Sequence, residues 1–356
     1  MNRVTAIGLA SLVAYGLLIA SKYAGIVSAH EEKPSQASGV SDEAALRAFV
    51  GEPQGTPAPA TVSLPPPLQH PERMRLTPAS LDFRAAKDLK AYADNMSAHR
   101  GSLSGDERYN LARALEECQF TTNINEDLAA YSAKQRRQFI ANLNPSDPNA
   151  ARRIAAYDAS DNTQRCLHFQ GTRISQKDIE DLYNAAAQQG DARAQARLLV
   201  AELNAKISAN SKNEAATPPA AVTGDDMSRI ISLLESRDPE AMLIVGNLLA
   251  QSAIASQLHI GPNGEVPEPS ALIGAFSLVA CDESSDCTQL TRDPQLACAY
   301  SGYCDATTFE ELYQNFMASP WAYAQATRYR TIIHTAIDSH NWSLIGLVPK
   351  RAAAVQ

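Results

Sequence analysis

Four of the six cysteines of this 356-residue chain lie in one short stretch, and this stretch restricts the fold more than any other feature. They are Cys281, Cys287, Cys298 and Cys304, in the pattern C-x5-C-x10-C-x5-C. Structural zinc sites usually separate paired cysteines by about two to four residues, so zinc fits poorly. No Cys-x-x-Cys pair supports redox chemistry. We therefore expect disulfides that form a cross-linked joint between helices.

The spacing also suggests a pairing for these cysteines. The equal x5 intervals favour Cys281 with Cys298 and Cys287 with Cys304, as two parallel bridges between successive segments. Cys118 and Cys166 are then left to pair with each other. Closing so long a loop stabilises a protein by roughly 4 kcal/mol in the chain-entropy model.

Residues 1–29 have the composition of a targeting segment. Arg3 precedes an apolar run without charges, residues 4–21, and Val27-Ser28-Ala29 places small residues before a cleavage point. The run is near the lower limit of the roughly 17–25 residues that span a bilayer. Both a cleaved signal peptide and a retained inner-membrane anchor therefore stay open. Either one predicts a periplasmic or secreted chain, which agrees with disulfides.

The rest of the chain divides into a tether and two helical regions. Residues 30–78 contain nine prolines among Ser, Gly, Ala and Gln, which predicts an extended tether. A short helix within it, at 41–51, either lies on the main body or docks a partner. The helical regions are 79–216, with one repeat-like helix pair, and 217–356, with the four-cysteine segment.

From Leu81 onward, apolar residues recur at helical spacing, and no alternating run of strand length occurs. Aromatic residues are few, at 6%, and alanine is abundant, which suits closely packed helices. Two helix starts carry a capping aspartate followed by proline at the first helical position, Asp147-Pro148 and Asp238-Pro239.

Two helix pairs resemble the Sel-type helical repeat, a relative of the tetratricopeptide repeat. The first match is Leu182 to Gln195, LYNAAAQQGDARAQ, and the second is Asp238-Pro239-Glu240-Ala241 followed by Val245-Gly246. In the first match, Gly190 lets the chain leave one helix in a left-handed conformation and Asp191 caps the next. The alanines allow the helices to approach closely.

Asp191 and Asp238 lie 47 residues apart, longer than the usual period of this repeat, so the resemblance implies an irregular array. A single repeat cannot bury its own faces, so flanking helices must supply its neighbours. Helices interspersed with paired cysteines also make the chain similar to exported proteins of Gram-negative bacteria whose function is unassigned. The fold class predicted is all-α: an irregular helical-repeat, α-solenoid-like body with disulfide-stapled C-terminal helices.

The sequence offers no catalytic, cofactor-binding or metal-binding residues. The formal net charge of −8 disfavours nucleic acid as a partner. The nucleophile, phosphate-loop, dinucleotide and His-Glu-x-x-His motifs are absent. Adjacent acidic pairs such as Glu116-Glu117 point about 100° apart on a helix. The arginine pairs Arg136-Arg137 and Arg152-Arg153 are expected on solvated helix faces.

Aromatic residues near the C-terminus recur at helical spacing and either pack in the core or line a ligand or glycan groove: Phe309, Tyr313, Phe316, Trp321, Tyr323, Tyr329 and Trp342. The leading hypothesis is a protein–protein interaction or scaffolding module of the cell envelope, which binds its partner on the concave side of the helix pairs around 175–255. The alternative is a hydrolase or lyase that acts on envelope polymers with a carboxylate-based site.

Overall fold

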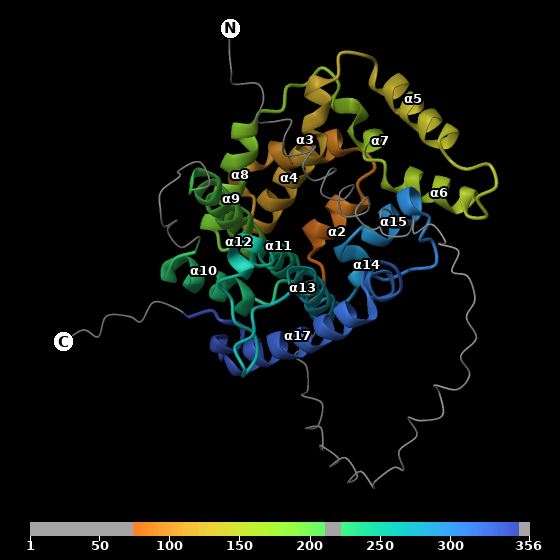
Figure 1. Ribbon diagram of the computed structural model, residues 1–356. Coiled ribbons are helices and arrows are strands. Elements are labelled where there is room, and N and C mark those ends of the chain that lie inside the picture. Colours follow the sequence, from red (N-terminus) through yellow and green to blue (C-terminus); the bar gives the residue numbers. More distant parts are fainter. Residues whose placement is uncertain (1–73, 211–221, 349–356) are drawn as a thin grey trace, which may run out of the picture. The chain divides into compact units, whose positions relative to one another are not determined.

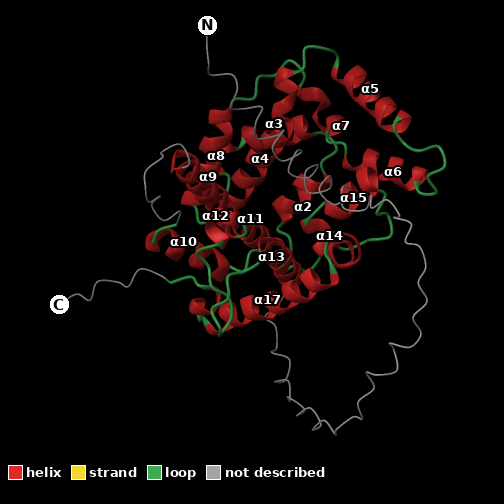
Figure 2. Cartoon of the chain, viewed as in Figure 1, coloured by secondary structure: helices red, strands yellow, loops and turns green. Residues whose placement is uncertain are grey.

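The computed structural model describes residues 74–210 and 222–348, and every regular element in these two ranges is a helix (Figures 1 and 2). The predicted all-α fold is confirmed there. The expected targeting segment 1–29, the tether as far as residue 73 with its short helix at 41–51, and residues 211–221 and 349–356 lie outside the described residues. No described helix has the length and hydropathy needed to cross a membrane.

The first described range contains eight α-helices and three 3-10 turns: α2 (Pro78–Ala85), α3 (Leu89–Ala98), η2 (Arg100–Ser102), α4 (Gly105–Cys118), η3 (Gln119–Asn123), α5 (Leu128–Ala141), α6 (Ala150–Ser160), α7 (Thr163–Cys166), η4 (Leu167–Phe169), α8 (Gln176–Gln188) and α9 (Ala192–Asn210). The second contains α10 (Gly224–Glu235), α11 (Pro239–Leu249), α12 (Ser252–Ala255), α13 (Pro269–Glu283), α14 (Cys287–Leu290), α15 (Asp293–Ser301), α16 (Phe309–Leu312), the π-helical turn η5 (Tyr313–Met317), α17 (Pro320–Ser339) and η6 (Trp342–Ile345).

Polar caps set the helix starts that the sequence suggested, with one exception. Gly190 takes φ +87° between α8 and α9, and Asp191 accepts a 3.0 Å hydrogen bond from the Ala194 amide. Asp238 caps α11 in the same way, with Pro239 at its first position. The prediction that Asp147 caps a helix is wrong. Asp147 instead accepts a 2.8 Å bond from the Asn149 amide in a turn, because α6 begins three residues later.

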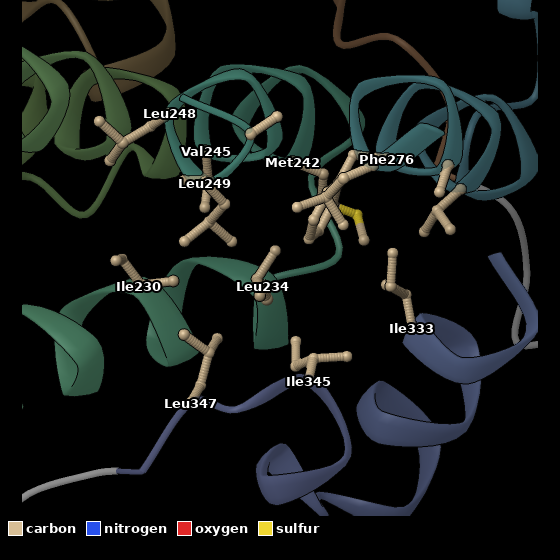
Figure 3. Packing of buried hydrophobic residues seen from close by; sticks show 14 of the residues in the cluster. Ile230, Leu234, Met242, Val245, Leu248, Leu249, Phe276, Ile333, Ile345 and Leu347 are labelled. Carbon is tan, nitrogen blue, oxygen red and sulfur yellow. The ribbon is translucent and has the colours of Figure 1, made fainter. Parts of the chain in front are cut away.

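Buried apolar side chains form two large clusters in the described residues, and α9 contributes to both of them. The first cluster lies among α3, α4, α7 and α8 and includes Ala194 of α9. The second lies among α10, α11, α13 and α17 and includes Leu199 and Leu203 of α9. Figure 3 shows α10, α11 and α13 directing Ile230, Leu234, Met242, Val245 and Phe276 towards one another, with Ile333, Ile345 and Leu347 from the C-terminal segments.

Two glycines allow close helix contacts in the second cluster. A Cβ added at Gly246 of α11 would lie 2.3 Å from the Cβ of Phe276 of α13. A Cβ added at Gly274 of α13 would lie 2.2 Å from the ring of Tyr313. Gly246 is thus the small residue that lets α11 and α13 meet.

All six cysteines form disulfides, and the predicted pair Cys118–Cys166 joins α4 to α7. The pairing expected for the other four is wrong, because the structure joins Cys281 to Cys287 and Cys298 to Cys304. The reason is local. The chain turns back at the ends of α13 and α15, which brings residues six positions apart to Cα distances of 4.7 and 4.2 Å. Each C-terminal disulfide therefore closes one helix end.

Candidate functional site

Charged and aromatic side chains from four helices meet between the two apolar clusters. We call this group the junction cluster. It consists of Tyr109, Arg113 and Glu116 of α4, Tyr183 of α8, Arg193 and Arg197 of α9, Glu240 of α11 and its cap Asp238. α4 and α8 contribute to the first apolar cluster, α11 contributes to the second and α9 contributes to both. The junction cluster therefore fixes the first part of the fold against the second.

Glu240 is the central anion of the junction cluster. It accepts a 2.6 Å hydrogen bond from the Tyr109 hydroxyl and a short ion-pair contact from Arg113. Burial favours the neutral acid, but the charge of Arg113 and the bond from Tyr109 outweigh it and hold the pKa of Glu240 below its usual range. Burial and the nearby Glu240 charge raise the pKa of Tyr109. The phenol therefore stays protonated and acts as a donor.

Arg193 is buried and joins the start of α9 to α4. Its guanidinium pairs with Asp191 at 2.6 Å and Asp106 at 2.5 Å, and it donates a 2.9 Å bond to the Ser80 hydroxyl. It also lies 4.2 Å above the centre of the Tyr109 ring, which is cation–π geometry. These contacts account for the orientation of the α8–α9 helix pair on α4.

The pKa of Asp238 is raised and the pKa of Glu240 is lowered, and pairs of carboxyl groups shifted apart in this way also occur in acid–base catalysis. Burial raises the pKa of Asp238 to about 6, against the opposing bond from the Ala241 amide and the charge of Arg193. A catalytic pair must face a cavity that admits substrate. Asp238 instead caps α11, and Glu240 is occupied by Arg113 and Tyr109. We therefore read both as structural residues.

An open groove of about 300 Å³ lies over the α8–α9 pair and α10. Its leucine side chains are buried or half-buried and form an apolar floor, and its polar side chains are exposed at the rim. The lining residues are Ala187, Gln195, Leu198, Leu199, Arg229, Ser232 and Leu233. We call this the helix-pair groove. It lies within the region 175–255 that the sequence suggested as a binding surface.

A second open groove, of about 420 Å³, lies between α5, α6 and α15. We call it the arm groove. It is lined by Gln135, Gln138, Phe139, Asn142, Leu143, Arg153, Tyr157 and Tyr300. The lining of both grooves lacks a carboxylate, so neither groove offers the acid–base pair that a hydrolase or lyase requires.

A third polar group joins α13 to α17 beside the Cys281–Cys287 disulfide. Asp282 accepts bonds from Arg330 Nε at 2.6 Å and from His334 Nε2 at 2.8 Å. Burial raises the pKa of Asp282, but these two partners outweigh it and bring the pKa to about 2. The group holds the long C-terminal helix in place and occupies neither groove.

The sequence-predicted residues have mixed outcomes. Phe309, Tyr313, Tyr329 and Trp342 are buried in the core, whereas Trp321 is 60% exposed. Arg136 lies on a solvated face, paired with Asp158, as predicted. Arg152 is also exposed, and it bonds Asp305 and the Cys304 carbonyl. The same prediction is wrong for Arg153, because its largely covered guanidinium bonds the backbone at the end of α15.

The sequence pattern did not identify the aromatic residues of the arm groove. Phe139, Tyr157 and Tyr300 come from three helices, and the last lies 143 positions beyond Tyr157, so no local spacing connects them. The junction cluster was missed for the same reason. The arginine pair at 152–153 was the one available signal, since it bonds the helix that carries Tyr300.

Comparison of the chain with models of known protein families, with curated protein sequences and with solved structures finds no match.

Proposed function

We propose that this chain is a protein–protein interaction or scaffolding module of the cell envelope, and that the helix-pair groove binds one amphipathic helix of a partner protein. Three disulfides indicate an oxidising, non-cytoplasmic compartment. We further propose that the chain is periplasmic or secreted, and that residues 4–21 anchor it in the inner membrane if that segment is retained.

The observation that carries the proposal is the chemistry of the helix-pair groove. Leu199 and Leu233 are buried and Leu198 is half-buried, so these leucines form an apolar floor. Gln195, Arg229 and Ser232 are exposed and form its rim. Recognition of a helix in a groove uses this combination, because the apolar face of the incoming helix buries against the floor while its polar face meets the rim. The groove takes an elongated apolar ligand better than a small polar substrate.

The helix-repeat interpretation supports the same function. Gly190 and Arg237 both adopt positive φ, +87° and +53°, immediately before Asp191 and Asp238. Each aspartate then accepts a bond from the amide three residues later, at 3.0 and 2.9 Å. The two turns are therefore alike in conformation, and we propose that α8–α9 and α10–α11 are degenerate repeats that bind a partner along their shared face.

Photo-crosslinking tests this proposal. A benzoyl-phenylalanine placed at Ser232, an exposed groove residue, should capture one specific envelope protein in cells of the source organism. The control places it at Ala205, an exposed position of α9 outside the groove lining. Capture of the same set of proteins from both positions, or of none from Ser232, would refute the proposal.

A further inference from the structure

We propose that the arm groove is a second binding site, which takes a neutral carbohydrate chain. This inference is independent of the helix-pair groove and of any protein partner. It depends on three features of the arm groove: its aromatic surface, the fixation of that surface, and the polar groups that surround it.

The aromatic surface is formed by three rings. Phe139 of α5 and Tyr157 of α6 stack with centroids 4.3 Å apart and planes 18° apart. Tyr300 of α15 meets both of them edge-on, at 5.7 and 6.2 Å. Tyr300 is 56% exposed, although the preceding residues 297–299 are buried. Three aromatic rings in contact beside one groove, with one of them this exposed, form a contiguous apolar patch, which is a feature of binding surfaces.

The rings are held in place by Arg153, which is not itself available to a ligand. Its Nε donates to the Ala299 carbonyl at 2.9 Å and one Nη donates to the Tyr300 carbonyl at 3.0 Å. The other Nη pairs with Asp147 at 2.7 Å. Arg153 therefore anchors the end of α15 to α6, so that Tyr300 meets Phe139 and Tyr157 before any ligand arrives. Such preorganisation lowers the entropy cost of binding.

The polar groups around the rings are neutral and free. The side-chain amides of Gln135, Gln138 and Asn142 line the arm groove and have no hydrogen-bond partner among the described residues. Each amide offers both a donor and an acceptor. The only cation in the lining, Arg153, is already neutralised by Asp147, so the groove has no free positive charge for a phosphate or carboxylate.

A ligand for this groove must therefore have a flat apolar face and a rim of neutral hydroxyl groups. A pyranose ring has both, because its C–H face stacks on an aromatic ring while its hydroxyls bond to planar amides. The groove volume of about 420 Å³ lies within the roughly 300–1,000 Å³ of small-molecule sites. An acidic glycan is disfavoured, because Arg153 cannot pair with it. A peptide with an apolar anchor is disfavoured, because four of the eight lining side chains are amides or a guanidinium.

The test uses the full chain on an array of neutral oligosaccharides built from glucose, galactose, mannose, N-acetylglucosamine and N-acetylgalactosamine. An acidic polygalacturonate fragment and a short extended peptide of neutral residues serve as competing probes. The expected result is saturable binding of at least one neutral oligosaccharide and of neither competing probe. Absence of binding to every neutral oligosaccharide, or binding of only a competing probe, would overturn the proposal.

Variants then locate the site for the best oligosaccharide by calorimetric titration. Tyr300→Ala should raise the dissociation constant about tenfold, by removing an exposed ring, and Tyr300→Phe should raise it less than threefold, because the ring remains. The matched control is Trp321→Ala, which removes a 60% exposed aromatic on α17 and should leave the dissociation constant unchanged. Equal effects of Tyr300→Ala and Trp321→Ala would place binding elsewhere and overturn the assignment.

Discussion

The Tyr109 hydroxyl donates a 2.6 Å hydrogen bond to the Glu240 carboxylate, across 131 positions of sequence. Tyr109 belongs to the first apolar cluster, and Glu240 lies in the first turn of α11, which contributes Met242 and Val245 to the second. The contact between the two parts of the fold is thus polar and charged at this point. The α8–α9 pair, which carries one wall of the helix-pair groove, is positioned by the same cluster of charges.

Removing the charge of Glu240 should be costly. In Glu240→Gln, Arg113 becomes a buried cation without its main partner, so the free energy of unfolding should fall by about 3 kcal/mol. Tyr109→Phe loses one hydrogen bond and should cost about 1–2 kcal/mol. Urea unfolding followed by circular dichroism measures both. Glu180→Gln on the exposed face of α8 is the control, and an equally small effect for Glu240→Gln would contradict this role.

Gly246→Ala should destabilise the second apolar cluster. The added methyl would lie 2.3 Å from the Phe276 Cβ, so α11 and α13 must separate, at a cost of about 1–3 kcal/mol or more. Gly101→Ala is the matched control, because its Cβ would meet no atom within 4 Å. Thermal unfolding compares the two variants. A melting temperature for Gly246→Ala equal to that of the control would show that this close packing is absent.

The three disulfides should contribute unequally to stability. Cys118–Cys166 closes a separation of 48 residues, whereas Cys281–Cys287 and Cys298–Cys304 each close 6. The chain-entropy model gives roughly 4 kcal/mol for the long loop and roughly 2 kcal/mol for each short one. Paired serine substitutions should follow this order in denaturant unfolding. Non-reducing peptide mapping checks the connectivity directly, and a peptide linking Cys281 to Cys298 would disprove it.

Acid should weaken the contact between α13 and α17. The pKa of Asp282 is lowered from 3.8 to about 2, so its contribution to stability is complete above pH 4 and is lost as the pH falls towards 2. The contribution is about 1–2 kcal/mol after allowance for solvent screening. Melting curves of the wild type and Asp282→Asn should therefore converge between pH 4 and pH 2. Curves that stay parallel over this range would contradict the assignment.

Local sequence patterns predicted the helices because each helix start depends on residues next to it. Gly190 and Asp191 are one example, since a left-handed residue followed by a cap needs no distant partner. Asp147 shows the limit. Its side chain accepts a bond from the Asn149 amide and pairs with Arg153, and Arg153 also bonds Ala299 at the end of α15, a contact that no local pattern reveals.

The grooves and the charged cluster could not be predicted from the sequence in the same way. Tyr300 reaches Tyr157 only after α15 has docked on α6. Glu240 reaches Tyr109 only after α11 has packed on α9 and α8 has packed on α4. The predicted disulfide pairing was wrong for a related reason. Equal spacing fits both parallel and local bridges, and the turn after α13 decides between them by returning Cys287 towards Cys281.

We propose that the helix-pair groove binds a helix of a partner protein, and this binding can be tested directly. The most direct measurement is a calorimetric titration of the partner captured from Ser232 against Ser232→Trp, which fills the groove, and Ala205→Trp, which adds the same side chain outside it. If a helix binds in this groove, the affinity should be at least roughly tenfold weaker for Ser232→Trp and unchanged for Ala205→Trp. Equal affinities for the two variants would contradict it.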